Sequence, residues 1–246
     1  MTLTEGGVPA PDVTVVVATL NEAGNVGRFW ERLESALGPS GHEVVFIDDH
    51  STDGTAELLR ALESRHPHVH LLERPTRGGT ASAQYEGWRR ARGRWVVVMD
   101  GDLQHRPEEV PRFLLPLEQG EADLVVGSRY VPGGSAPERP WGRSLISFGG
   151  DRAIRLLLPE TRWRTDPMSG FFAFRRELLE GPPLAPRGMK FLFYLLVRAR
   201  RERTRDVPIV FETRTTGKSK LVGRGMFRAL LSSAWGARRS RPSRSL

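Results

Sequence analysis

Two aspartates separated by a single glycine, Asp100 and Asp102, carry the clearest chemistry in the sequence. Side chains two residues apart in an extended chain point to the same side, and Gly101 between them lets a ligand approach the backbone. Paired carboxylates bind hard divalent cations, and Mg²⁺ commonly takes one or two of them together with substrate phosphate. Gln104 follows at the same spacing and could add an amide oxygen. The segment predicts a metal site of Asp100, Asp102 and Gln104.

Acidic residues also follow two other apolar runs. Asp48 and Asp49 end one run, and Asn21-Glu22 ends another. Asp53 can cap a following helix, but capping needs only one acceptor. The two additional aspartates therefore suggest recognition of a base N–H or a ribose hydroxyl. Taken alone, Asn21-Glu22 is more typical of a helix start with an acid near the positive end of the dipole.

Cations are scattered through the loops of the second half of the chain. They are Arg129 after Ser128, Arg143, Arg214 and the run Lys218–Lys220. Each one alone is most simply a surface charge. Together, opposite an acidic metal site, they would neutralise phosphates, for which the arginine fork is suited.

Several enzyme classes are disfavoured by what the sequence lacks. The chain has no cysteine, which excludes disulfides, thiolate metal sites and a cysteine nucleophile. The glycines at Gly78 and Gly79 are not followed by the Gly-Lys-Ser/Thr of a P-loop, and no GxGxxG follows the first apolar run. A P-loop NTPase and a Rossmann dehydrogenase are therefore not favoured.

The elements that must position these side chains alternate in type along the first half. Short apolar, β-branched runs predict strands at 13–18, 44–47, 69–72, 95–99 and 123–127. Helical spacing predicts helices at 21–37, from about 53 to 64, at 80–91 and from Pro107 onward. This alternation predicts an α/β fold, a mostly parallel sheet with helices on both faces. Ligands of such sheets bind beyond the carboxyl ends of the strands, where the three acidic tips lie.

The second half shows a looser pattern. It predicts helices at 145–158, 189–201 and 225–235, strands at 171–174 and 207–212, and a Pro/Gly turn at 166–170. The stretch 191–197 is apolar nearly all round a helix, which fits either a buried helix or a helix at a membrane surface. The last helix has an apolar side flanked by arginines, which fits an interfacial helix better.

The length and net charge of the chain limit the number of domains and the kinds of partner. The 246 residues fit one large domain, and the net charge of +8 suits nucleic acid, anionic lipid or phosphorylated substrates. Nucleic acid is not favoured, because strands with paired aromatics are not seen. We expect residues 1–12 to be flexible. With no signal peptide and no apolar run of about 20 residues, we expect a cytoplasmic protein, peripheral on the cytoplasmic face of the membrane.

Taken together, these segments resemble glycosyltransferase family 2, and within it the polyprenyl (dolichyl) phosphate mannose synthases. The resemblance covers roughly residues 13–221. It rests on VATLNE at 17–22, IDDHSTDGT at 47–55, MDGDLQH at 99–105, GSRYVPGG at 127–134, DPMSGF at 166–171 and TGKSKL at 216–221.

The resemblance implies an A-type glycosyltransferase fold with a catalytic domain at 13–222, followed by an amphipathic helix and basic tail at 223–246. It assigns Mg²⁺ or Mn²⁺ to Asp100, Asp102 and Gln104, and the catalytic role to Asp100, Asp102 and Arg129. It places the nucleotide-sugar at Ala18, Leu20, Glu22, Ile47, Asp49, Asp100, Gly101, Asp102, Arg214 and Lys220, and the acceptor phosphate at Arg129, Arg143 and Ser135. The family often has Pro-x-Tyr where this chain has Ala18-Thr-Leu20, so base stacking by a tyrosine is absent.

The implied reaction is inverting transfer of mannose from GDP-mannose to polyprenyl phosphate at a membrane surface, with a separate membrane-anchoring subunit as a possible partner. A second interpretation keeps the fold but uses UDP-glucose, another nucleotide-sugar or a non-lipid acceptor. A third is a non-catalytic protein that binds nucleotide or membrane without turnover.

Overall fold

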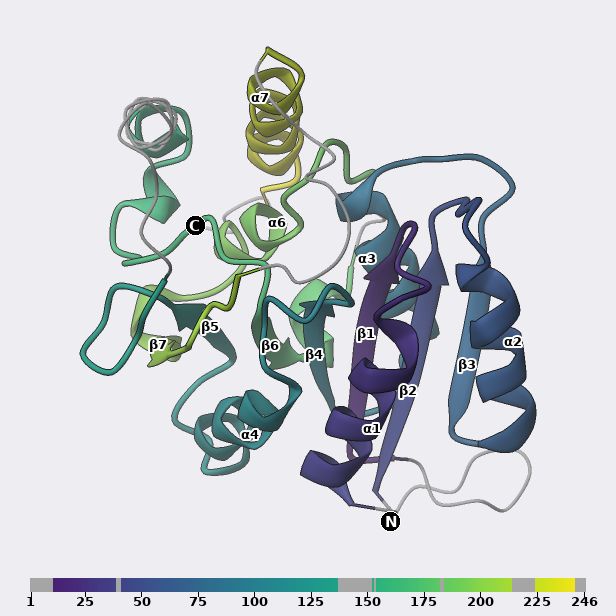
Figure 1. The fold of residues 1–246 in the computed structure, drawn as a ribbon. Helices are drawn as coiled ribbons and strands as arrows, with labels where there is room; N and C mark the ends of the chain where they lie inside the picture. Colours follow the sequence, from purple (N-terminus) through teal and green to yellow (C-terminus); the bar gives the residue numbers. More distant parts are fainter. Residues whose placement is uncertain are drawn as a thin grey trace.

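A computed structural model describes residues 11–38, 41–136, 152, 154–181, 184–213 and 224–241. Its strands form one seven-stranded sheet in the order β3-β2-β1-β4-β6-β5-β7 (Figure 1). The strands are β1 Val13–Thr19, β2 His42–Asp48, β3 Val69–Glu73, β4 Trp95–Asp100, β5 Leu124–Ser128, β6 Phe172–Arg175 and β7 Thr204–Pro208. Among these strands β6 alone runs antiparallel to its neighbours, so the predicted mostly parallel sheet is confirmed.

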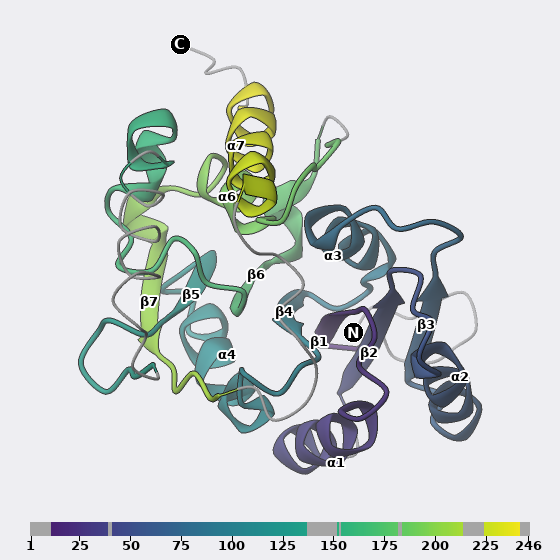
Figure 2. The same ribbon diagram turned by 45° about the horizontal axis from the view of Figure 1, so that its top comes forward.

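Helices cover both faces of the sheet, as expected. The α-helices are α1 Val26–Leu37, α2 Thr55–Arg65, α3 Thr80–Arg90, α4 Val110–Glu118, α6 Leu192–Leu196 and α7 Arg224–Arg239. Short 3-10 helices lie at Pro107–Glu109, Pro159–Thr161, Arg176–Leu179 and Arg201–Arg203. Figure 2 shows α3, α6 and α7 on one side of the sheet and α1, α2 and α4 on the other.

The alternation of side chains along the strands builds two cores. Val15 and Val17 of β1 pack with α1 and α4, whereas Val16 packs with α3 and α6 on the opposite face. All three valines are fully buried, and each such side chain contributes roughly 1.5–3 kcal/mol on leaving water. The β-branched run therefore forms a central strand that is apolar on both faces.

Three predicted elements have different bounds in the structure. The helix predicted at 21–37 begins only at Val26, because Asn21 adopts a left-handed conformation with φ of 51°. The helix predicted at 189–201 is confined to α6: the N–H groups of Met189 and Lys190 donate to Ser233 Oγ in α7, and the chain is already extended at Arg200, ahead of β7.

The strand predicted at 207–212 lies earlier, as β7. Pro208 has no N–H to continue the ladder, and the chain beyond it turns to other partners. Val210 forms a bridge with Ser135, and Phe211 forms one with His105. The segment after β7 therefore closes over the acidic tip of β4.

The two apolar helices of the second half differ in burial. The residues of α6 are all buried, so 191–197 is core. Helix α7 buries Leu230, Ala234 and Ala237 in the same core but exposes Phe227 and Trp235. No helix among the described residues is long and apolar enough to cross a membrane. Residues 145–151 of the predicted helix at 145–158 lie outside the described residues, and the domain boundary after residue 222 stays a prediction.

Candidate active site at the carboxyl edge of the sheet

The strand register brings three predicted site residues into one row. Ala18 of β1 pairs with Ile47 of β2 on one side and with Asp100 of β4 on the other. The chain runs outward from β1 through β2 to β3 and then returns to place β4 on the other side of β1. The carboxyl ends of β1 and β4 therefore flank a topological switch point, which is where open α/β sheets bind ligands.

The backbone at this edge is unusual. Among the described residues, three that are not glycine have a positive φ: Asn21 at 51°, His50 at 66° and Leu103 at 61°. They follow β1, β2 and β4 respectively, within three residues of the strand end. The left-handed conformation costs roughly 1–2 kcal/mol for a residue with a Cβ, and such strain clusters at functional sites.

The tip of β4 presents oxygen atoms from a compact turn. Asp100 is its partly buried last residue, and Asp102 is buried with its Oδ1 accepting the N–H of Gln104 at 3.1 Å. The Gln104 side-chain amide donates through Nε2 to Glu212 O at 3.2 Å, so its Oε1 is the atom suited to a cation. Two carboxylates and an amide oxygen form an oxygen-only set that fits Mg²⁺ or Mn²⁺.

The turn at 166–170 lies directly against this tip. A Cβ built on Gly170 would lie 2.7 Å from Asp100 Oδ2 and 3.3 Å from His105 Nε2. Only glycine fits this approach without displacing the carboxylate. Read alone, 166–170 is a bare Pro/Gly turn with one acid, and only the family resemblance of DPMSGF at 166–171 marks it as part of the site.

His105 is buried below the oxygen set. Its pKa is lowered from 6.5 to about 4, chiefly by burial; the charges of Arg129 and Lys190 also lower it, whereas those of Asp102 and Asp166 oppose the shift. The imidazole is therefore neutral at physiological pH and adds no charge to the site. Its ring packs against Phe171 and Phe211, with centroids 5.3 and 5.0 Å away.

Arg129 is held by a carboxylate of this chain. Its Nε donates to Asp166 Oδ2 at 2.6 Å and its Nη2 to Asp166 Oδ1 at 2.8 Å, and both side chains are nearly buried. Burial alone would lower the pKa of Arg129, but the hydrogen bonds and charge of Asp166 raise it. The guanidinium is thus permanently charged and fixed in orientation, and sequence analysis missed Asp166 as its partner.

The acidic tip of β2 is engaged within the protein. Asp49 Oδ1 accepts Arg74 Nη1 and the N–H of Gly78, both at 2.8 Å, and Oδ2 accepts the N–H of Gly79 at 2.9 Å. Asp49 therefore holds the segment before α3, at Gly78 and Gly79, against the carboxyl edge of the sheet through hydrogen bonds. The expectation that it also contacts a nucleotide stays a prediction.

The remaining predicted residues are dispersed. Glu22 is buried and accepts Asn25 Nδ2 at 2.6 Å, the Ile47 side chain is in the core, and Leu20 is partly buried just past β1. Ser135 is exposed and pairs through its backbone with Ile209 and Phe211. Arg143, Arg214, Lys218 and Lys220 lie outside the described residues.

Lys190 is a further cation near the site that sequence analysis missed. Its Nζ donates to Met168 O in the 166–170 turn, while the Met189 and Lys190 N–H groups donate to Ser233 Oγ at 2.9 and 3.1 Å. This bridge joins α7 to the turn that covers Asp100.

Comparison with known proteins identifies the family. The model described as glycosyl transferase family 2 matches residues 14–181. A dolichol-phosphate mannosyltransferase of Pyrococcus furiosus is 39% identical over 218 residues, covering 89% of this chain but only 61% of that protein. A polyprenol monophosphomannose synthase of Mycolicibacterium smegmatis is 36% identical over 240 residues, covering 94% of this chain and 89% of that protein.

Solved structures agree on the fold. Glucosyl-3-phosphoglycerate synthase from Mycobacterium tuberculosis in complex with phosphoglyceric acid superposes with a TM-score of 0.68 at 25% identity, covering 92% of this chain and 80% of that one. The same enzyme with Mn²⁺ and UDP-glucose gives a TM-score of 0.69 at 23% identity, over 95% and 81% of the two chains. On the matched family model and the identity of these relatives, the chain belongs to glycosyltransferase family 2.

Proposed function

We propose that the protein is an inverting glycosyltransferase that moves mannose from GDP-mannose to the phosphate of a polyprenyl phosphate. The observation that carries the proposal is the oxygen set of Asp100, Asp102 and Gln104 beside the β1/β4 switch point. Relatives named as dolichol-phosphate and polyprenol-phosphate mannosyltransferases support the sugar and the acceptor.

The proposed reaction does not require a strong general base. The second pKa of a phosphate monoester lies near 6, so the acceptor is largely ionised at neutral pH and its oxygen is already nucleophilic. That oxygen forms the new bond to the anomeric carbon, while the bond from this carbon to the nucleoside diphosphate breaks. No proton has to move in this step.

The protein must therefore hold two anions together. Asp100, Asp102 and Gln104 would bind Mg²⁺ or Mn²⁺, which would stabilise the charge of the departing diphosphate. Arg129, fixed by Asp166, would present a permanent positive charge to the acceptor phosphate. Arg143, Ser135, Arg214 and Lys220 complete the proposed phosphate contacts, and Ala18, Leu20, Glu22, Ile47, Asp49 and Gly101 the proposed nucleotide contacts.

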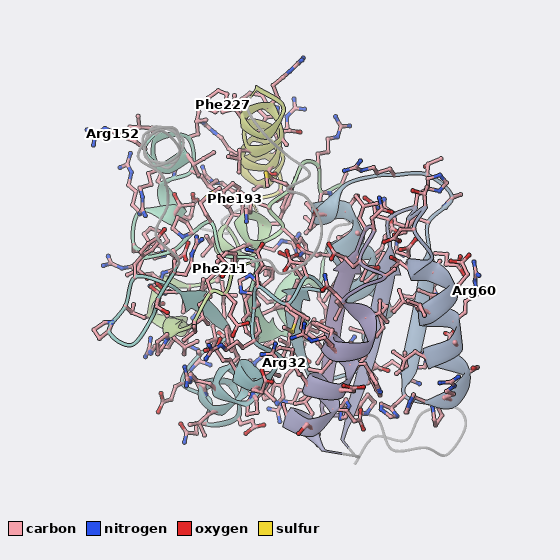
Figure 3. All side chains as sticks on the ribbon, viewed as in Figure 1. Arg32, Arg60, Arg152, Phe193, Phe211 and Phe227 are labelled. Atoms are coloured by element: carbon pink, nitrogen blue, oxygen red, sulfur yellow. The ribbon has the colours of Figure 1, made fainter. Side chains whose placement is uncertain are left out.

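A lipid acceptor requires access to a membrane surface. Phe227 and Trp235 of α7 are 46% and 59% exposed, and Leu156 on the helical segment 154–157 is 67% exposed. Figure 3 places Phe227 of α7 and Arg152 at the same end of the molecule. We propose that these apolar side chains, with the arginines of α7, rest on an anionic membrane as a peripheral contact.

The activity is tested with tag-free protein, radiolabelled GDP-mannose or UDP-glucose, a short polyprenyl phosphate and Mg²⁺. We expect label from GDP-mannose in the lipid phase, none after EDTA, and a loss of rate in Asp102→Asn but not in Glu108→Gln, which changes an exposed acid on the 3-10 helix Pro107–Glu109. Labelling from UDP-glucose alone would support the second interpretation. Absence of labelling from every nucleotide-sugar tried would refute the transferase proposal.

A further inference from the structure

Three metal-binding side chains meet at the amino edge of the sheet, opposite the site described above. Glu34 comes from the last turn of α1, His42 is the first residue of β2, and His68 directly precedes β3. Their ligand atoms all lie within 4.8 Å of one another. From this cluster we infer a second metal site, one that binds a transition metal ion of the zinc class.

The distances fit tetrahedral coordination. Glu34 Oε2 lies 3.6 Å from His42 Nε2 and 3.3 Å from His68 Nε2. Zinc–ligand bonds of about 2.0–2.1 Å put neighbouring tetrahedral ligand atoms about 3.4 Å apart. The two imidazole rings stand nearly perpendicular with centroids 5.0 Å apart, and two imidazoles on one tetrahedral ion have centroids about 5 Å apart. The ligand nitrogens of the two histidines lie within 4.8 Å of each other, so we expect a small movement of the side chains to bring all three ligands onto one ion.

The backbone that carries the three ligands is held in place. His68 O accepts the N–H of Val44 in β2 at 2.9 Å, and Glu34 O accepts the N–H of Gly38 at the end of α1 at 2.9 Å. Trp30 packs against His68 with ring centroids 5.6 Å apart. Because the ligand-bearing segments are fixed before metal binds, little order would have to be created on binding.

The surroundings leave room for a fourth ligand. The His42 side chain is 2% exposed, whereas those of Glu34 and His68 are 28% and 25% exposed. A surface hollow lined by Trp30, Glu31, Glu34, Ser35 and Gly38 opens beside the cluster. Three protein ligands with one side open to solvent is a common zinc arrangement, in which water completes the shell.

The donor set separates this site chemically from the one at the other edge. Two imidazoles and one carboxylate favour zinc-class ions, whereas the oxygen-only set at Asp100 favours magnesium or manganese. The seven residues of β2 separate the two edges by about 20 Å. The second site would fasten α1, β2 and β3 together and would take no part in sugar transfer.

The test uses tag-free, EDTA-stripped full-length protein titrated with Co²⁺ and then Zn²⁺. We expect one equivalent of Co²⁺ to give the visible absorption of a tetrahedral site, Zn²⁺ to displace it, and Zn²⁺ to raise the Tm. His68→Ala and Glu34→Gln should each weaken Zn²⁺ binding at least about tenfold, because a ligand is lost.

Two variants serve as matched controls. His70→Ala removes a histidine two residues away that faces Glu43 and Arg92, and it should bind Zn²⁺ like the wild type. Asp102→Asn should also retain Zn²⁺ binding, which separates this site from the carboxyl edge. Circular dichroism checks that each variant is folded. Equal Zn²⁺ affinity in the wild type and in folded His68→Ala, or no binding by the wild type, would overturn the inference, whatever the transfer assay gives.

Discussion

The two edges of the same parallel strands are built differently. At the carboxyl edge, Asn21, His50 and Leu103 hold left-handed conformations around an acidic site. At the amino edge, the positive φ angles next to β2 fall on Gly38 and Gly41, which adopt them without penalty. There Glu43 accepts Thr14 Oγ1 at 2.7 Å and Arg92 Nε at 2.6 Å. The comparison indicates that backbone strain is tolerated at the edge that carries the candidate active site, whereas hydrogen bonds to Glu43 stabilise the opposite edge.

The largest expected effect is on the buried ion pair of Arg129 and Asp166, which lies at the candidate active site and also stabilises the fold. Arg129→Ala would leave the buried Asp166 carboxylate without its partner, and we expect a loss of about 3–5 kcal/mol in the free energy of unfolding. Urea denaturation measures it, with the half-exposed Arg112→Ala as control. A folded variant of native stability that has lost activity would mean that Arg129 serves only the substrate.

Asp102→Asn tests whether the carboxyl edge serves catalysis, because we expect it to change the rate and not the stability. Removing one carboxylate from the proposed metal site should lower kcat by about 10²–10³-fold, a typical loss when one group that stabilises transition-state charge is removed. Steady-state transfer assays measure kcat, and thermal unfolding should give an unchanged Tm. Full activity with excess Mg²⁺ would exclude Asp102 as a ligand.

Glu43→Gln tests whether the amino edge serves stability, because we expect it to change the pH dependence of unfolding and not the transfer reaction. Burial would raise the pKa of Glu43, but hydrogen bonds from His70, Arg92 and Thr14 lower it from 4.5 to about 2. Its stabilisation is therefore complete above pH 4.5 and is lost as the pH falls toward 2, by about 3 kcal/mol. Urea unfolding across this range should show a shallower pH dependence in the variant, whereas the exposed Glu118→Gln should keep the wild-type slope.

Gly170→Ala places a methyl group against the Asp100 carboxylate. The contact of 2.7 Å requires a shift of the carboxylate or of the turn, and we expect kcat to fall about tenfold with little change in stability. Gly27→Ala in α1 is the control, since its Cβ would meet nothing within 4 Å. Equal rates for the two variants would show that the turn adapts freely.

The smallest expected effect is the change in stability when a residue with a left-handed backbone conformation, His50, is replaced by glycine. His50 is exposed, so His50→Gly removes a left-handed residue with a Cβ without opening a cavity. We expect a gain in the free energy of unfolding of at most about 1 kcal/mol, because the relief of strain is partly offset by the greater entropy of unfolded glycine. A clear loss of stability would contradict the strain assigned to this edge.

The first half of the fold could be predicted from sequence because its signals are local. Each strand of β1 to β4 contains a short apolar run, and the acids Asp48 and Asp100 directly follow the runs of β2 and β4. What escaped prediction depends on residues far apart. Asp166 meets Arg129 across 37 positions, and Ser233 in α7 accepts the N–H groups of Met189 and Lys190 ahead of α6. No local pattern encodes these contacts.

The bridge through Lys190 links the proposed membrane contact of α7 to the proposed donor site. Ser233 of α7 holds the Lys190 backbone, and Lys190 Nζ holds Met168 O two residues before Gly170. Any coupling through this bridge must be reciprocal: the factor by which a bound surface tightens nucleotide-sugar binding equals the factor by which the nucleotide-sugar tightens surface binding. With such coupling, the enzyme would bind the nucleotide-sugar most tightly at the membrane, where the lipid acceptor lies. It would bind the membrane less tightly after the nucleotide-sugar has been consumed.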